Sequence, residues 1–353
     1  MLNEILVGQV QGTSVAPDRV TFGDYMTRWV ASRDGQITPM TADVYDRMVR
    51  NYLRPRAIAS VRLQALSAID LDRLYVELER SGGVSGAPLA ATTVKQFHAM
   101  VHKGLGDAVR KRILPLNVAD AADAPKPDRH REYSVWTEEE ISRFLAHIKD
   151  EPIYPAVHLA AMTGMRRGEI LGLRWPDIDF AENRLSVRIS LTVVKGQPVF
   201  SVAKTQRSVR AIDLDPQTMT VLKAHRKTHN ERLLLLGSHF EYPKQVFTDT
   251  SGRWIHPNAF TYTFSRLVRQ APVPYIRFHD LRHTHATLML KSGIPTLVVS
   301  ERLGHAHPAF TMDRYQHVIP GMQRDAAAQF AERVSSFGSA AETHSSARAD
   351  DGT

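Results

Sequence analysis

Four residues in the last quarter of the chain have side chains that together could act on a phosphate. They are His279, Arg282, His305 and Tyr315, and the first two stand three residues apart, so a helix would place them on one face. A tyrosine hydroxyl is a weak nucleophile at neutral pH because its pKa is about 10. It becomes useful when cations and proton-transfer groups surround an anionic electrophile beside it. The stretch therefore predicts phosphate chemistry, provided that other segments supply further cations.

The same stretch also has the spacing of a metal site, because His279 and His283 are four residues apart. The glutamate of a zinc-protease His-Glu-x-x-His is absent, since Asp280 takes its place. An arginine inside the motif favours an anionic ligand over a dication, so we expect no metal. A buried structural role is the other alternative for His283 and His285.

Two more cations come from upstream segments. Arg166 lies in Thr-Gly-Met-Arg-Arg-Gly-Glu at 163–169, where one helical pattern ends and another begins, and Glu169 could orient its guanidinium group. Lys204 lies in the turn between two predicted strands, where a mobile ammonium group could protonate a leaving oxygen. The alternatives are a surface arginine in a helix–helix turn and a solvated lysine at a hairpin tip.

Composition limits the class of protein. With 353 residues the chain is long enough for about two domains, and its formal net charge of +8 favours a polyanionic partner. The absence of cysteine excludes disulfides, thiolate nucleophiles and cysteine-bound zinc, and it fits a cytoplasmic protein. The amino-terminal residues lack the pattern of a signal peptide, and no apolar run reaches the ~18 residues that a membrane span requires.

Residues 21–118 have helical periodicity and predict a bundle of about four helices. Thr38-Pro39 predicts one helix start, and Asp70 is expected to cap another helix. The polar, proline-containing segment 119–133 is expected to be a linker.

The segment 134–335 predicts a second domain, which opens with a capping box at Thr137 and Glu140. Alternating residues from Leu185 to Thr192 predict a strand, followed by strands at 199–203 and 209–214. Helical patterning returns after residue 216, and the small, polar tail at 336–353 is expected to be disordered. The sequence therefore predicts a mainly α fold with a small antiparallel β-sheet.

These motifs resemble those of the tyrosine recombinase (phage integrase) family over roughly residues 21–335. The resemblance rests on Thr-Gly-x-Arg-x-Gly-Glu at 163–169, the hairpin lysine, His-x-Leu-Arg-His at 279–283, Leu-Gly-His at 303–305 and the tyrosine that follows. It implies two catalytic arginines, a lysine, two histidines and a nucleophile, namely Arg166, Arg282, Lys204, His279, His305 and Tyr315. Arg166 fits better than Arg167 because it lies two residues after Gly164 and three before Glu169. Glu169 and His283 would support these groups.

The resemblance implies a site-specific recombinase that joins DNA to Tyr315 through a 3′-phosphotyrosyl bond and integrates or excises a mobile element. Because the intermediate conserves the bond energy, no cofactor is expected. A helical SAM-like core-binding domain and an α+β catalytic domain would grip double-stranded DNA. The alternatives are a type IB topoisomerase-like relaxing enzyme and a non-catalytic DNA-binding protein with the same fold.

The resemblance also implies partners. Four protomers would assemble on paired sites, with accessory DNA-bending or directionality proteins, and no membrane is expected. The lead 1–20 is expected to be the remnant of, or the junction after, an arm-binding domain. Candidate phosphate contacts, each of which could also be a solvated residue, are Arg47, Arg50, Arg54, Arg56, Arg110, Lys111 and Arg112.

Overall fold

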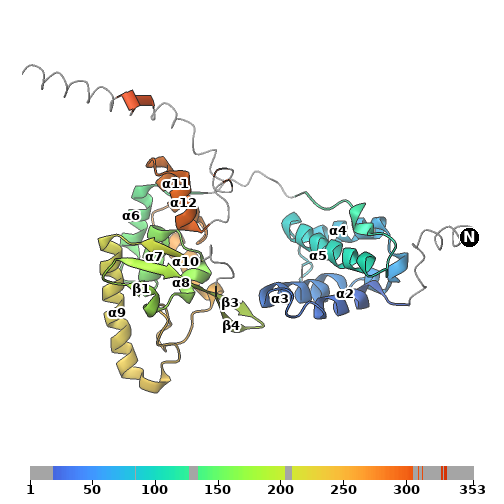
Figure 1. The fold of residues 1–353 in the computed structure, drawn as a ribbon, viewed down its shortest axis with the longest axis horizontal. Helices are drawn as coiled ribbons and strands as arrows, with labels where there is room; N and C mark the ends of the chain where they lie inside the picture. The colour runs from blue at the N-terminus through green and yellow to red at the C-terminus, as the bar shows by residue number, and fades with distance from the viewer. Residues whose placement is uncertain are drawn as a thin grey trace, which may run out of the picture. The chain divides into compact units, whose positions relative to one another are not determined.

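A computed structural model of the chain describes residues 19–83, 85–126, 134–202 and 209–304, and the single residues 309, 312, 327, 328, 330 and 331. The chain divides into two compact units (Figure 1). Residues 1–132 form the body of the first unit, and residues 133–353 contribute most of the second. Residues 1–18 of the expected lead (1–20) and the whole of the expected tail (336–353) lie outside the described residues.

The elements of the first unit are helical. They are α2 (Phe22–Ala31), α3 (Pro39–Met48), a π-helical turn η1 (Val49–Leu53), the 3-10 turns η2 (Ala57–Ser60) and η3 (Leu63–Ala65), α4 (Ala68–Ser81), α5 (Ala91–Arg110) and the 3-10 turn η4 (Val118–Asp120). Their apolar faces enclose one core, in which Phe22, Leu53 and Phe97 have no exposed surface. Tyr25 donates a hydrogen bond of 2.8 Å to the Gly104 carbonyl, so α2 and α5 are also joined by a polar contact.

The helix caps explain where these elements begin. Thr38 accepts a hydrogen bond from the Thr41 amide at the start of α3, as predicted. The prediction for α4 was wrong by one turn: Ser67 is the N-cap, and Asp70 is the third helical residue of a capping box. Both side chains are good caps, and the hydrophobic pattern by itself does not choose between them.

The second unit contains seven α-helices, two 3-10 turns and five strands within the described residues. They are α6 (Glu138–His147), α7 (Tyr154–Thr163), α8 (Arg167–Gly172), η5 (Trp175–Asp177), β1 (Ile178–Asp179), β2 (Arg184–Val187), β3 (Ile189–Val194), β4 (Gln197–Val202), β5 (Arg210–Asp213), α9 (Pro216–Leu236), η7 (Gly237–His239), α10 (Pro257–Gln270), α11 (Asp280–Lys291) and α12 (Thr296–Leu303). The expected capping box of Thr137 and Glu140 begins α6. The mainly α fold with small antiparallel sheets is confirmed.

The strands form two sheets instead of one. β1, β2 and β5 make an antiparallel three-stranded sheet in that order, while β3 pairs only with β4 in a separate two-stranded sheet. The single strand expected from Leu185 to Thr192 is therefore broken at Arg188. Apolar and polar residue types alternate without interruption from Leu185 to Thr192, so the sequence pattern does not reveal the break.

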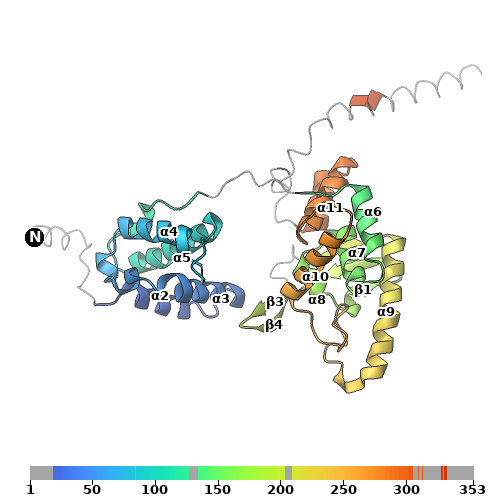
Figure 2. The ribbon, with the colours of Figure 1, turned by 180° about the vertical axis from the view of Figure 1, so that it is seen from behind.

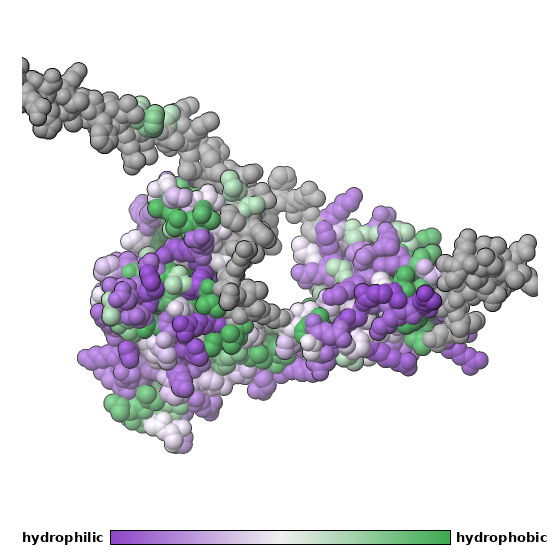
Figure 3. All heavy atoms as spheres, in the orientation of Figure 1, coloured by the Kyte–Doolittle hydropathy of each residue, from purple (hydrophilic) through white to green (hydrophobic). Residues whose placement is uncertain are grey.

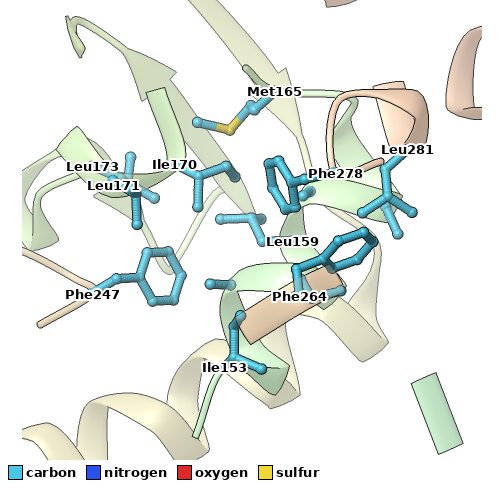
Figure 4. Packing of buried hydrophobic residues seen from close by; sticks show 14 of the residues in the cluster. Ile153, Leu159, Met165, Ile170, Leu171, Leu173, Phe247, Phe264, Phe278 and Leu281 are labelled. Atoms are coloured by element: carbon cyan, nitrogen blue, oxygen red, sulfur yellow. The ribbon is translucent and has the colours of Figure 1, made fainter. Parts of the chain in front are cut away.

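The core of the second unit lies where the motif-bearing segments meet. Figure 4 shows Met165 and Ile170, from the two sides of the α7–α8 break, close to Leu159 and to Phe278 just before α11. Phe278 also makes edge-on contacts with Phe264 in α10, with ring centroids 5.3 Å apart. This packing fixes the start of α8 and the start of α11 relative to each other.

The long helix α9 lies along one side of this unit and packs on α7 (Figures 1 and 2). Hydrophobic side chains gather at its carboxyl end (Figure 3), where Leu234 and Leu235 are 84% and 85% exposed. Across the part of the chain that the structure describes, no helix has the length and apolar character needed to cross a membrane.

A glycine in the 163–169 motif allows α8 to approach β3 closely. A Cβ atom at Gly168 would lie 2.5 Å from the Ser190 Oγ and 2.7 Å from the Leu191 carbonyl oxygen. The carbonyl cannot move without disturbing β3. The close packing of α8 on β3 therefore requires a residue without a side chain at position 168.

We expect Gly168→Ala to lower the free energy of unfolding of the second unit by about 1–3 kcal/mol, because the added methyl group displaces β3. Scanning calorimetry of the full chain measures this change. Gly106→Ala in α5 is the control, since a Cβ there would lie 3.7 Å from its neighbour, the Asn117 amide. That variant is expected to be neutral or slightly more stable, and an equal loss in both variants would contradict the packing argument.

Candidate active site

Three of the six predicted catalytic residues lie in described segments of the second unit. Arg166 precedes α8, His279 precedes α11, and Arg282 is in the first turn of α11. Lys204, His305 and Tyr315 lie outside the described residues.

The break between α7 and α8 presents Arg166. Gly164 ends α7 in the left-handed conformation with φ of +64°, which a residue with a side chain adopts at a cost. Arg166 is then the N-cap of α8: its amide and its Nη1 donate to the Glu169 carboxylate at 2.8 and 2.9 Å. The Arg166 side chain is 45% exposed, whereas that of Glu169 is 9% exposed. A buried carboxylate thus orients an exposed guanidinium group.

The neighbouring arginine has a different environment. The Nη1 of Arg167 donates to the Pro257 carbonyl at 3.1 Å and to the Thr261 hydroxyl at 2.6 Å, both in α10. Arg167 thereby joins α8 to α10. These contacts give Arg167 a structural role.

Arg282 is buried and joins two helix ends. Its Nη1 donates to the Gly164 carbonyl at the end of α7, and its Nη2 donates to the Leu303 carbonyl at the end of α12, both at 2.8 Å. Helix carboxyl ends carry partial negative charge, so both contacts are favourable for a cation. Dipoles neutralise only part of the guanidinium charge, and the remainder can act on an anion.

The carboxyl end of α12 is held by three arginines from different segments. The last carbonyl groups of a helix have no partner within the helix. Here the Gly304 amide bonds the Glu301 carbonyl, and the next three carbonyls each accept from a guanidinium group. Arg210 bonds residue 302 at 2.8 Å, Arg282 bonds residue 303 at 2.8 Å, and Arg166 bonds residue 304 at 3.2 Å. His305 is the next residue in the chain.

Glu169 is the carboxylate within this cluster. Arg210 donates to both of its oxygens, at 3.1 and 2.8 Å, in addition to the bonds from Arg166. Burial alone would raise the pKa of Glu169, but the hydrogen bonds and charge of Arg210, followed by those of Arg166, lower it to about 2. The carboxylate is therefore ionised throughout the physiological range.

Around His279, the side chains of His279 and Arg277 are exposed, whereas those of Asp280 and His283 are buried. His279 is exposed, and its ring lies 5.1 Å from that of the buried His283, nearly perpendicular to it. Asp280 accepts three bonds from Arg277, one from its amide and two from its guanidinium group. Burial would raise the pKa of Asp280, but these contacts with Arg277 lower it. Asp280 thus anchors the start of α11.

For His285 the sequence allowed either a chemical or a structural role. Its side chain lies between α7 and α12. Its Nδ1 donates to the Ala161 carbonyl at 3.0 Å, and its Nε2 accepts from the Nε of Arg302 at 3.2 Å. Burial, followed by the charge of Arg302, lowers the pKa of His285 to about 4. The ring is therefore neutral at pH 7 and has a structural role.

Two arginines of this cluster, Arg210 and Arg302, are not among the residues predicted from the sequence. Arg210 shares a face of β5 with Ile212, which is buried, and its side chain is 7% exposed. An arginine at a core-facing position of a strand is unusual, and this was the signal available in the sequence. Arg302 donates to the Met162 and Asp213 carbonyls as well as to His285, which joins α12 to α7 and β5.

The candidate DNA contacts in the first unit differ in exposure. Arg56 lies inside: its side chain is 11% exposed and bonds the Asn51 and Tyr52 carbonyls and Glu77. The remaining six are on the surface, and four of them, Arg47, Arg50, Arg54 and Arg110, form ion pairs with carboxylates. They are Arg47, Arg50, Arg54, Arg110, Lys111 and Arg112. Within the described segments, no three histidine, aspartate or glutamate side chains are grouped as a metal site would require.

The sequence of this chain is similar to those of known proteins. The sequence model described as the phage integrase family matches residues 134–321. A XerC-like tyrosine recombinase of Caldanaerobacter subterraneus subsp. tengcongensis is 29% identical over 345 residues, which span 92% of this chain and 86% of the relative.

Two solved structures have a similar fold. A Tn1549 transposon integrase in complex with a circular intermediate DNA has a TM-score of 0.72 and 18% identity, covering 86% of this chain and 99% of that one. A lambda integrase tetramer bound to a Holliday junction has a TM-score of 0.58 and 16% identity, covering 87% of each chain.

The lowered pKa of His285 predicts a pH-dependent stability. Between about pH 6.5 and 4 the unfolded chain binds a proton at this ring that the folded chain excludes, so stability is present above this window and is lost as the pH falls through it. The loss is about 1.4 kcal/mol per pH unit for one such group. His285→Gln keeps a donor and an acceptor but does not titrate, so its stability should fall less steeply.

Urea unfolding of both proteins across this pH range measures the difference. His239→Gln is the control, because His239 is exposed. It measures how the loss of an imidazole group by itself changes the stability. Equal slopes for wild type and His285→Gln would contradict the assignment of a neutral, structural His285.

Proposed function

The chain belongs to the phage integrase family of tyrosine recombinases, and we propose that it cuts and rejoins DNA with Tyr315 as its nucleophile. It is a site-specific DNA recombinase. The observation that carries the proposal is the approach of two guanidinium groups, those of Arg166 and Arg282, to adjacent carbonyls at residues 304 and 303. They meet directly before His305 in the sequence, where the motif Leu-Gly-His ends.

In the proposed reaction the Tyr315 hydroxyl oxygen attacks phosphorus, and the bond from phosphorus to the 5′-oxygen breaks. The products are a 3′-phosphotyrosyl bond and a free 5′-hydroxyl. Arg166 and Arg282 stabilise the negative charge on the equatorial oxygens of the transition state. In the reverse step the 5′-hydroxyl of a partner strand attacks the phosphotyrosine, which restores the tyrosine and completes the exchange.

Proton transfer in this proposal uses the remaining motif residues. His279 accepts the proton of Tyr315, and Lys204 donates a proton to the leaving 5′-oxygen. His305 donates a hydrogen bond to a non-bridging oxygen. Glu169 and His283 support Arg166 and His279, respectively. No metal or nucleotide cofactor takes part in these steps.

Double-stranded DNA is the proposed substrate, and the element integrated or excised is proposed to be mobile. Four copies on paired sites would perform the exchange, with accessory DNA-bending or directionality proteins acting on the complex. The six exposed candidates in the first unit, Arg47, Arg50, Arg54, Arg110, Lys111 and Arg112, are proposed phosphate contacts. Arg56 is left out because its guanidinium group is occupied inside the unit.

The first test is covalent capture of DNA by Tyr315. Wild-type protein is mixed in EDTA with a pool of singly nicked duplexes of randomised sequence, and DNA that stays attached after detergent treatment is sequenced. The sequence recovered then provides a defined substrate. We expect an adduct with wild type and none with Tyr315→Phe, because the phenyl ring lacks the attacking oxygen.

An adduct that survives Tyr315→Phe would overturn the nucleophile, and the absence of any adduct with wild type would favour a non-catalytic DNA-binding protein. Wild type should also transfer the captured strand to a second duplex. Relaxation of supercoiled plasmid without such transfer would favour a topoisomerase-like activity.

The second test compares neighbouring arginines. Arg166→Lys should slow single-turnover cleavage of the defined substrate by about 10²–10³-fold, because a lysine cannot present two forked donors to the phosphate. Arg167→Lys should lower the melting temperature but leave cleavage close to that of wild type, because its contacts are with α10. Equal losses of cleavage in the two variants would contradict the assignment.

A further inference from the structure

We infer that Arg210, on β5, is a positioning residue for DNA cleavage. It holds together the carboxylate that orients Arg166 and the helix end that leads to His305. The inference rests on the proposed function of this site and assigns it an additional arginine. Neither the motifs in the sequence nor the proposed chemistry includes Arg210.

The hydrogen bonds around Arg210 form a closed ring. Its two terminal nitrogens bond both oxygens of Glu169, and its Nε bonds the carbonyl of residue 302 at 2.8 Å. Glu169 bonds Arg166, and Arg166 returns to α12 through the carbonyl of Gly304. The ring therefore joins three segments that are far apart in the sequence, and movement of one changes the other two.

The glycine at the end of α12 is a second, independent observation. A Cβ atom at Gly304 would lie 2.9 Å from the Nη1 of Arg210 and 3.0 Å from its Cδ. The backbone there has φ of +69°. The Arg210 side chain thus packs directly against Gly304, the residue that precedes His305 in the sequence.

Arg210 acts through these partners and not on DNA. Its side chain is 7% exposed, and its described donors face protein oxygens. A lysine could keep a positive charge near Glu169, but its three donors share one nitrogen, so it could not reproduce the planar fork with which three arginine nitrogens reach both carboxylate oxygens and a carbonyl. We therefore expect the forked geometry of Arg210 to matter as well as its charge.

The experiment measures single-turnover cleavage of the defined substrate at saturating protein, together with binding of that substrate in a Tyr315→Phe background. Arg210→Met should slow cleavage by about 10²-fold while the dissociation constant changes by less than about threefold. Arg210→Lys should give an intermediate rate, and it decides the question if Arg210→Met does not fold. Arg184→Met is the matched control, because Arg184 pairs with Asp213 on the exposed side of the same sheet.

A double-mutant cycle with Glu169→Gln separates positioning from general destabilisation. If Arg210 acts through Glu169, the double variant should be no slower than the slower single variant.

The pH dependence of the cleavage rate gives a second readout. The charged groups that face the Glu169 carboxylate are Arg166, from the same segment, and Arg210, from β5. Arg282 and Arg302 lie at the same end of α12. Arg210→Met should therefore lose activity at a higher pH than wild type as Glu169 protonates, and Glu169→Gln should remove that added dependence.

If both Arg210 variants cleave at the wild-type rate and with the wild-type pH dependence, the inference is overturned and the proposed function stays intact. Additive losses in the cycle, with a lowered melting temperature and an unchanged pH profile, would also overturn it, because they indicate a purely structural arginine. If wild type forms no adduct at all, the proposed function fails first and the inference fails with it.

Discussion

The carboxyl end of α12 is the point on which the rest of the candidate site depends. A helix end needs partners for its last carbonyl groups, and burial makes an unpaired carbonyl costly. This helix is only eight residues long, so its own hydrogen bonds cannot fix its direction. Guanidinium groups from β5, α11 and the start of α8 supply the partners and determine where the helix ends. The same contacts determine where Arg166 and Arg282 lie. The hydrogen bonds that cap α12 are therefore also the ones that arrange the cationic site.

Two glycines make this solution possible. Gly164 and Gly304 both end helices with positive φ, and both lie against side chains of the cluster: a Cβ at Gly164 would be 2.9 Å from the His285 ring. Each glycine turns its chain sharply and leaves a carbonyl facing an arginine. The Thr-Gly-x-Arg and Leu-Gly-His motifs therefore have the same physical basis. In both, a glycine ends a helix close enough to a guanidinium group for that group to cap it.

The sequence predicted the parts of this arrangement that depend on local rules. Caps at Thr38 and Thr137 and the apolar periodicity located most helices, because those signals act within one or two turns. The strand break at Arg188 was missed because side-chain alternation continues across it. Arg210 and Arg302 were missed for a different reason. Apart from the bond of Arg302 to His285, their partners are main-chain carbonyls and a carboxylate more than forty residues away in the chain, and spacing along the sequence carries no information about such contacts.

The electrostatics of the cluster connect its folding to its chemistry. Arg166, Arg210, Arg282 and Arg302 lie around one helix end, and like charges at such distances repel. One ionised carboxylate, Glu169, and the carboxyl ends of α7 and α12 offset part of that repulsion. Within the described residues, Glu169 is the carboxylate that these arginines bond, and the charges of Asp213 and Asp215 also act on Arg302. Four guanidinium groups thus face three carboxylates, so this part of the cluster keeps an excess of positive charge. A phosphodiester group would supply the missing negative charge and relieve the repulsion at the same time. Partial compensation is therefore suited to this site: full pairing with carboxylates would give a more stable protein with weaker attraction for DNA.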